Sequence, residues 1–348
     1  MEMNGDKLAW LRGLYPGYFS LTMATGIVTI ATDALEMKLF SMVLGAITIL
    51  SWLVLLVLYT WRLLRYPTVV WSELTNPSTT FIFFTFVAGT DIVGMILHGY
   101  HLGQLALATW LFALVAWGGL LHVSFSVLTL SHEERKANVV HGGWLICIVG
   151  TQSLVLLGVN VLDQVGEWAP SMMVWLYMLW GIGLILYAIF VTLFCYRIFF
   201  LSMSEEDYSP LMWVIMGAAA ICANASSTLS LNDPMMPVLV AMHPVVDATA
   251  LLAWAWASWW IPLLVVIGIW KHYLRGHPIH YHPMQWSIVF PLGMYTVTSY
   301  RLALAADFTP LHVLSHGMVW VALAAWLLVM VGMVRTLSLA RRKGWFSE

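Results

Sequence analysis

Three ionisable residues fall inside long apolar stretches of this sequence, namely Asp91, Asp247 and Arg301. Charge inside a membrane is costly and is retained there mainly for function. At a helical rise of about 1.5 Å per residue, Asp91 lies about 21 Å from the start of its stretch at Pro77 and Arg301 about 27 Å from Pro283. Arg301 either attracts anions as a free cation or forms a structural ion pair with Asp91 or Asp247. We favour the ion pair, because an unpaired Asp91 would repel an anion.

Hydroxyl side chains form a second set of candidates, because they are concentrated in stretches that are also rich in glycine and alanine. A conduction path needs partners that bind an anion weakly enough to let it leave, and hydroxyl groups meet that need. A Ser or Thr in a membrane helix often bonds a carbonyl of its own helix instead, so both roles stay open. The pore-lining candidates are Thr22, Thr25, Thr29, Thr85, Thr90, Thr151, Ser153, Ser226, Ser227, Thr296 and Ser299.

The histidines raise a different hypothesis, a metal or haem site. His98 with His101, and His312 with His316, have spacings that suit a metal ion, and a haem is held by histidines on facing helices. The histidines in or near apolar stretches are His122, His141, His243 and His312. Because they scatter instead of pairing at matched depths, a haem- or metal-binding membrane oxidoreductase is a remote alternative, and we expect no metal and no cofactor.

The elements that position these residues follow from composition. Of the 348 residues, 61% are apolar and 9% charged, whereas a soluble domain carries about a quarter charged residues. A hydrocarbon core of about 30 Å needs about 20 apolar residues per helix. The sequence therefore predicts an all-α integral membrane protein with ten transmembrane helices, near residues 14–32, 39–61, 77–97, 102–130, 139–161, 170–200, 210–230, 238–270, 283–306 and 309–334.

Two of these stretches are longer than a single membrane crossing needs. The stretch 170–200 suits a single long helix that is either tilted or extends past the membrane face. The stretch 238–270 is expected to hold a loop before its helix begins. A turn at Asn232, Asp233 and Pro234 separates the seventh stretch from the eighth.

Lysine and arginine are unevenly distributed among the connections. Those on one face are Lys7, Arg12, Arg62, Arg65, Arg135, Lys136, Arg197, Lys271, Arg275, Arg335, Arg341, Arg342 and Lys343. The opposite face carries Lys38 alone among loop cations, with Asp33, Glu36, Asp163, Glu167, Asp233 and Asp307. Because cytoplasmic loops are enriched in Lys and Arg, we place both termini in the cytoplasm, which agrees with an even number of spans.

The ten stretches alternate in composition. The odd-numbered ones are crowded with Gly, Ala, Ser and Thr, and the even-numbered ones with Leu and Trp. Short connections force sequential helices to pack antiparallel, which makes five hairpins. Small residues also let helix backbones approach closely whatever the function, but a solid bundle gives no reason for the alternation. We expect the odd-numbered helices to line a central pore and the even-numbered ones to face lipid.

Several motifs recur in a characteristic order along the chain. They are Pro16-Gly17-Tyr18-Phe19 leading into Met23-Ala24-Thr25-Gly26-Ile27-Val28; Asn76-Pro77 with Phe83-Phe84-Thr85-Phe86 and Gly89-Thr90; Gly142-Gly143-Trp144 with Thr151-Gln152-Ser153; and Trp286 followed by Phe290-Pro291-Leu292-Gly293-Met294-Tyr295. With these motifs the chain resembles the tellurite-resistance/dicarboxylate transporter family, which includes the plant slow anion channels, yeast malate permease and fungal sulfite exporters. The resemblance covers essentially the whole chain. It implies five helical hairpins with quasi-fivefold symmetry, odd-numbered helices inside, and a homotrimer with a pore in each subunit.

The resemblance also implies a gate. In family members a phenylalanine on the ninth helix plugs the pore, and the matching residue here is Phe290, which precedes Pro291. An aromatic ring at a constriction excludes water, and a hydrophobic constriction can close a pore by dewetting. Pro291 removes a helical hydrogen bond, so local backbone movement is easier there. The expected kink or hinge positions are Pro16, Pro77, Pro291 and Gly293.

The predicted function is passage of small inorganic or C4-dicarboxylate anions, such as chloride, nitrate, malate, sulfite or tellurite. The sequence contains no Walker motif, dinucleotide fingerprint or nucleophile elbow, so we expect flux to run on gradients and not by primary active transport. We expect that the protein is not an enzyme. The alternative is a proton-coupled carrier for malate, sulfite or tellurite, in which His243 or Asp247 holds the proton. We expect one transmembrane domain over residues 1–348, in the inner or plasma membrane, with the lipid bilayer and a small anion as partners and no nucleic acid.

Overall fold

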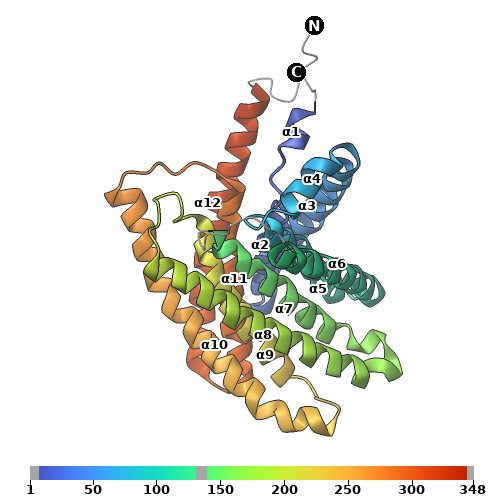
Figure 1. The fold of residues 1–348 in the computed structure, drawn as a ribbon. Helices are drawn as coiled ribbons and strands as arrows, with labels where there is room; N and C mark the ends of the chain where they lie inside the picture. The colour runs from blue at the N-terminus through green and yellow to red at the C-terminus, as the bar shows by residue number, and fades with distance from the viewer. Residues whose placement is uncertain (1–7, 131–138, 343–348) are drawn as a thin grey trace.

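The computed structural model describes residues 8–130 and 139–342, and this part of the chain folds into helices without a strand. Its long helices each coincide with one of the ten predicted stretches (Figure 1). They are α2 (Phe19–Ala34), α3 (Lys38–Arg65), α5 (Phe84–Gly99), α6 (Gly103–Leu130), α7 (Ile146–Asn160), α8 (Ala169–Phe200), α9 (Val214–Ser230), α10 (Pro237–Ile269), α11 (Trp286–Ala305) and α12 (Thr309–Arg342).

Short helical segments connect or begin the long helices. They are α1 (Ala9–Arg12), α4 (Pro67–Leu74), the 3₁₀ turns η1 (Thr80–Phe83), η3 (Gly142–Leu145), η4 (Leu162–Gln164), η5 (Gly166–Trp168), η6 (Pro210–Trp213) and η8 (Pro283–Gln285), and the π turn η7 (Trp270–Leu274). Pro16 and Pro77 lie in turns ahead of α2 and η1. The prediction that these two prolines kink their helices is wrong, because a proline ahead of the first turn costs no helical hydrogen bond.

The predicted alternation is confirmed by burial. In its most apolar window the segment Gly142–Asn160 is 100% buried and Pro210–Ser230 is 94% buried, whereas Gly103–Leu130 is 11% buried and Thr309–Ala340 is 17% buried. We call α2, α5, α7, α9 and α11 the inner helices and α3, α6, α8, α10 and α12 the outer helices. Many Leu side chains on the outer helices are exposed, as are Trp61, Trp175, Trp259 and Trp320, which is the arrangement lipid contact requires.

The inner helices form a closed ring of contacts. Each packs against the next in the order α2, α5, α7, α9 and α11, and α11 packs back against α2. Each inner helix also packs against the outer helix that follows it in the chain, α2 with α3 through to α11 with α12. Figure 1 shows α5 beside α6 and α7 beside α8.

Two local expectations have different outcomes. The long stretch 170–200 is a single 32-residue helix, α8, as predicted. The prediction of a loop at the start of 238–270 is wrong, because α10 is helical from Pro237 onward and continues through Pro244 and Pro262. Proline at the first helical position is favourable, and the turn at Asn232–Pro234 supplies the break instead.

One face of the molecule holds the predicted basic connections, and two buried arginines form ion pairs there. Arg62 forms a bidentate pair with Glu73 at 2.7 Å for each contact and also donates to the Arg12 carbonyl. Arg197 pairs with Asp207 at 2.6 Å. We call this the basic face. Lys7, Arg135, Lys136 and Lys343 lie outside the described residues, as do the side chains of Arg341 and Arg342.

Candidate functional site

All five inner helices begin at the basic face. Contacts link η1 to η3, η3 to η6, η6 to η8 and η8 to α2, so the segments that begin the inner helices lie together. His141 joins two of them, since its Nε2 lies 2.6 Å from the Ser78 carbonyl and its Nδ1 accepts from Gly143 N at 3.0 Å. Because Nδ1 accepts from Gly143, the proton of a neutral His141 lies on Nε2, which donates to the Ser78 carbonyl. The positive ends of five helix dipoles therefore point towards this face.

Five tryptophans tie the ring to the outer helices with one recurring bond. In each case the indole N–H on an outer helix donates to a hydroxyl on the inner helix of the next hairpin. The bonds are Trp52 to Thr90 (3.0 Å), Trp117 to Thr151 (2.8 Å), Trp180 to Ser226 (2.9 Å), Trp254 to Ser299 (3.0 Å) and Trp326 to Thr25 (3.0 Å). The last bond joins the fifth hairpin to the first, so the series closes on itself. We call these the five indole bonds.

The indole bonds correct part of the predicted pore lining. Thr25, Thr90, Thr151, Ser226 and Ser299 lie against outer-helix indoles, so these hydroxyls are directed to the seams between hairpins. Thr22 likewise meets Ser51 of α3 at 2.9 Å. Among the rest, Thr29, Ser227 and Thr296 donate to carbonyls of their own helices at 2.9 to 3.0 Å, the role usual for a membrane Ser or Thr. Thr85 donates to the Ile82 carbonyl of the preceding turn η1 at 2.9 Å.

Each indole bond is expected to stabilise the fold by about 1 kcal/mol, the net value of one buried hydrogen bond. Trp180→Phe keeps the ring but removes the N–H, so we expect the melting temperature in detergent to fall by a few degrees. Trp175→Phe on the same helix is the control, because Trp175 is 65% exposed and should change the melting temperature little. Equal melting temperatures for the two variants would show that the indole bonds do not stabilise the ring.

Phe290 is fully buried within α11 at a point where this helix touches two neighbours. A Cβ on Gly217 of α9 would lie 2.8 Å from the Pro291 ring, and a Cβ on Gly293 would lie 2.8 Å from Ile27 of α2. Both glycines therefore allow close helix approach on either side of Phe290. Pro291 lies inside α11, which stays helical from Trp286 to Ala305. Pro291 and Gly293 are therefore both helical residues, and their role as hinge positions stays a prediction.

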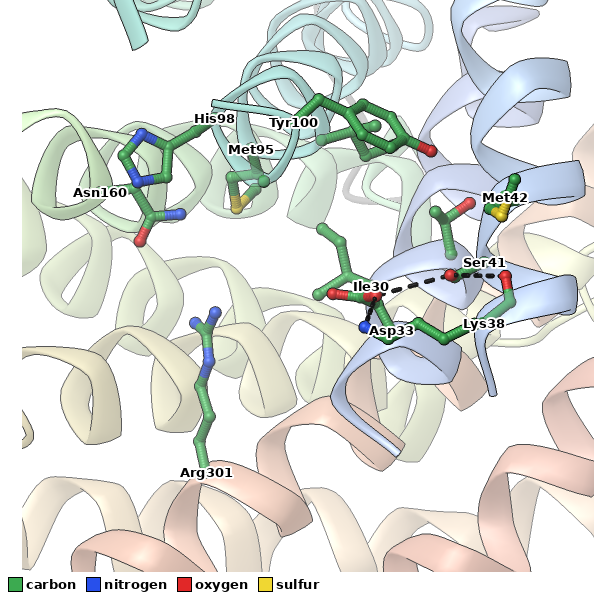
Figure 2. Close-up of a pocket in the computed structure, with 13 residues that line it drawn as sticks. Ile30, Asp33, Lys38, Ser41, Met42, Met95, His98, Tyr100, Asn160 and Arg301 are labelled. Carbon is green, nitrogen blue, oxygen red and sulfur yellow. Dashed lines mark hydrogen bonds and ion pairs between the residues drawn. The ribbon is translucent and has the colours of Figure 1, made fainter. Parts of the chain in front are cut away.

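A cavity of about 480 Å³ opens at the end of the ring opposite the basic face. The final turns of α2, α5 and α7, the start of α3, and α11 line it, and the polar groups among its lining are Thr29, Asp33, Lys38, Ser41, His98, Tyr100, Asn160 and Arg301. We call it the vestibule. In Figure 2 the Arg301 guanidinium points from α11 into the vestibule towards Asn160 and His98.

Arg301 has no carboxylate partner among the described residues. Its Nη1 donates to Thr228 Oγ1 at 2.7 Å and to Asn224 Oδ1 at 3.4 Å, both on α9. The predicted ion pair with Asp91 or Asp247 is therefore wrong. Counting along the sequence placed Asp91 and Arg301 at similar depths. The Arg301 side chain instead reaches α9, and its helix α11 is not a neighbour of α5 in the ring.

The two aspartates have other partners. Asp91 is fully buried, and its Oδ2 lies 2.6 Å from Ser153 Oγ on α7. Asp247 is exposed on α10, where it accepts from Ser230 at 2.6 Å and lies 3.3 Å from His243 Nδ1. Lys38, the other cation of the vestibule, pairs with Asp33 at 2.9 Å. Arg301 is thus the vestibule cation whose charge is left uncompensated by a carboxylate.

Sequence reasoning missed the residues that hold Arg301. Asn224 and Thr228 are one turn apart on α9 and present their oxygens to the guanidinium. Asn160, at the last position of α7, lines the vestibule. An Asn and a Thr spaced by four residues were the available signal, because that spacing places both on one helix face.

No group of three His, Cys, Asp or Glu side chains able to hold a metal ion occurs among residues 8–130 and 139–342. Several of the histidines considered for a metal or haem have other contacts, whereas Nδ1 of His98 is buried without a hydrogen-bond partner. His316 Nδ1 bonds the His312 carbonyl at 2.8 Å, and His122 bonds the Gly118 carbonyl at 2.7 Å. His141 caps a turn. None of these three imidazoles faces a second histidine on the opposite side of the inner helices.

Comparison with known proteins agrees with this architecture. Residues 13–334 match the family described as a voltage-dependent anion channel. The chain is 36% identical over 142 residues to a Mycobacterium tuberculosis H37Rv protein named an uncharacterized membrane protein, covering 41% of this chain and 72% of that one. Two Methanocaldococcus jannaschii proteins named uncharacterized transporters are each 21% identical, over 339 and 349 residues, covering 93% and 95% of this chain and 94% and 95% of theirs.

The fold and these matches define a class first. Eight of the described helices are long and apolar enough to cross a membrane, so this is a multi-pass membrane protein of the transport class. The chain belongs to the voltage-dependent anion channel family, and it is an anion channel or transporter.

Proposed function

We propose that this protein passes small inorganic or C4-dicarboxylate anions along a path enclosed by the five inner helices, with Phe290 as the gate. The observation that carries the proposal is Arg301, a cation without a carboxylate partner that points into a vestibule at one end of a closed helical ring. A guanidinium held by two neutral oxygens keeps its full charge available for an anion.

Helix dipoles support anion passage from the basic face. The inner helices start there, and helix N-terminal ends attract anions. At the vestibule the same helices present their negative C-terminal ends, which oppose an anion. The charge of Arg301 offsets this field, so an anion meets favourable potentials at both ends and Phe290 between them.

We extend the proposal to ten membrane crossings with quasi-fivefold symmetry. The helices beyond the eight apolar ones are α2, which is short, and α11, which carries several polar residues; both are inner helices covered by protein. The five indole bonds repeat once per hairpin, as such symmetry requires. We further propose one transport domain over the whole chain, cytoplasmic termini, a homotrimer with one path per subunit, and the inner or plasma membrane as its location.

The polar lining proposed for the path is smaller than the sequence predicted. Thr29 lines the vestibule. Thr85, Ser227, Thr296 and Ser153 stay as proposed contacts deeper in the ring, where their oxygens are buried. Asp247 is set aside, because it is exposed on an outer helix and bonded to Ser230 and His243.

The test is flux through the purified protein in liposomes. We expect uptake of at least one of chloride, nitrate, sulfite and malate, driven by the imposed anion gradient and sensitive to membrane voltage. Empty liposomes and liposomes with heat-denatured protein are the controls. Correctly folded protein that passes none of these anions at any pH between 5 and 8 would overturn the proposal.

A further inference from the structure

Asp91 has an unusual environment for a carboxyl group within a membrane. It is fully buried between α5 and α7, and its Oδ1 has no hydrogen-bond partner. The contact that Oδ2 makes is the one to Ser153 Oγ, at 2.6 Å. A buried ionised carboxylate normally requires a cation or several donors, and the structure describes neither beside Asp91.

The two contacts of Ser153 Oγ depend on whether Asp91 carries a proton. Its Oγ lies 2.6 Å from Asp91 Oδ2 and 2.9 Å from the Gly150 carbonyl. A hydroxyl has one proton, so with an ionised Asp91 only one of the two contacts is a hydrogen bond. With a protonated Asp91 both are satisfied, because the carboxyl O–H donates to Ser153 Oγ and the Ser153 O–H donates to Gly150.

The helices packed against α5 carry other charged and titratable groups. On α2, α6 and α7 they are Asp33, His122 and Cys147; on α3 they are Lys38, Tyr59, Arg62 and Arg65. None of these is bonded to Asp91. The titratable group on its own helix is His98, two turns or about 10 Å further along the same face, where it lines the vestibule. Arg301 lines that cavity too but belongs to α11.

We propose that Asp91 is a proton-binding site that controls anion passage, which makes this a proton-gated anion pathway. The inference rests on the proposed function. A proton from water on the vestibule side binds Oδ2 of the Asp91 carboxylate, and the neutral acid then hydrogen-bonds Ser153 and leaves the ring free of negative charge. Loss of that proton to water places an uncompensated negative charge among the inner helices, which excludes anions by like-charge repulsion. Passage therefore occurs in the protonated state and stops as pH rises.

The experiment measures anion flux in liposomes with equal pH on both sides, stepped from 5 to 9. For the native chain we expect flux to fall about tenfold or more across one titration step. Asp91→Asn mimics the neutral acid in size and shape, and its flux should stay at the acid value at every pH. Ser153→Ala should move the midpoint to higher pH, because the ionised form loses its hydrogen-bond donor.

Two control variants separate Asp91 from other titrations. Asp247→Asn removes the exposed carboxyl on α10 and should keep the native pH profile. His98→Gln removes the vestibule imidazole, and the fall in flux at alkaline pH should persist. If Asp91→Asn keeps the native profile, or if the native flux does not vary with pH, Asp91 is not a proton site. Both results require measurable anion flux, whereas a chain that passes no anion at any pH fails the proposed function itself.

Discussion

Phe290→Ala is expected to raise anion flux about tenfold or more at pH values where the native chain conducts. The ring is fully buried at the point where α11 meets α9 and α2. Removing it opens a space that water can fill, and a hydrophobic constriction conducts once it is wet. Voltage-clamp current per channel in planar bilayers, normalised to the amount of protein, is the measurement.

A buried Phe→Ala change also costs about 3 to 5 kcal/mol of stability, so a matched control is needed. Phe194 is 2% exposed and lies on the outer helix α8. Phe194→Ala should lose comparable stability without a gain in current. Unchanged or reduced current in Phe290→Ala, with normal expression and a single gel-filtration peak, would contradict the gate.

Arg301→Gln is expected to lower anion flux at low anion concentration by about tenfold to a hundredfold. A unit charge about 5 Å from an anion at an effective dielectric constant of 20 contributes about 3 kcal/mol, and salt screening reduces this. Glutamine keeps hydrogen-bonding capacity towards Asn224 and Thr228 but carries no charge. Arg301→Lys should retain part of the flux, since the charge remains and the planar fork is lost.

Lys38→Gln is the matched control for Arg301. Lys38 also lines the vestibule, but it is exposed and paired with Asp33 at 2.9 Å, so its loss should change flux little. The effect of Arg301→Gln should diminish at high salt. Equal losses in the two variants, or a loss in Arg301→Gln that salt does not affect, would assign Arg301 a structural role on α9 instead.

The helices and their burial were predictable because both follow from local composition. A run of about 20 apolar residues must form a helix to satisfy its backbone in lipid, and small residues mark close helix contacts. Gly217 and Gly293 illustrate this, since a Cβ at either would lie 2.8 Å from a neighbouring helix. The alternation along the chain therefore separated inner from outer helices, and Arg301, which was expected in the half away from the basic face, lines the vestibule at that end.

The direction in which a side chain points around its helix was not predictable. Thr25 and Thr90 were predicted to line the pore because they lie on inner helices. Each instead accepts a hydrogen bond from an indole N–H on an outer helix. A small-residue helix has polar groups on more than one side, and only its neighbours decide which side faces the ring. For the same reason the contacts of Asn224 and Thr228 with Arg301 were not predicted, because they depend on α9 lying next to α11.

By itself the sequence determined the class of protein, the positions of its helices, and their division into inner and outer sets. These depend on composition and on the fixed rise of a helix. Only the tertiary structure decided which charges meet. Arg301 and Asp91 were expected at similar depths, but they lie on non-adjacent helices, so one stays a cation without a carboxylate partner at the vestibule and the other a buried acid beside Ser153. Depth is counted along one helix, whereas pairing depends on the order of helices around the ring.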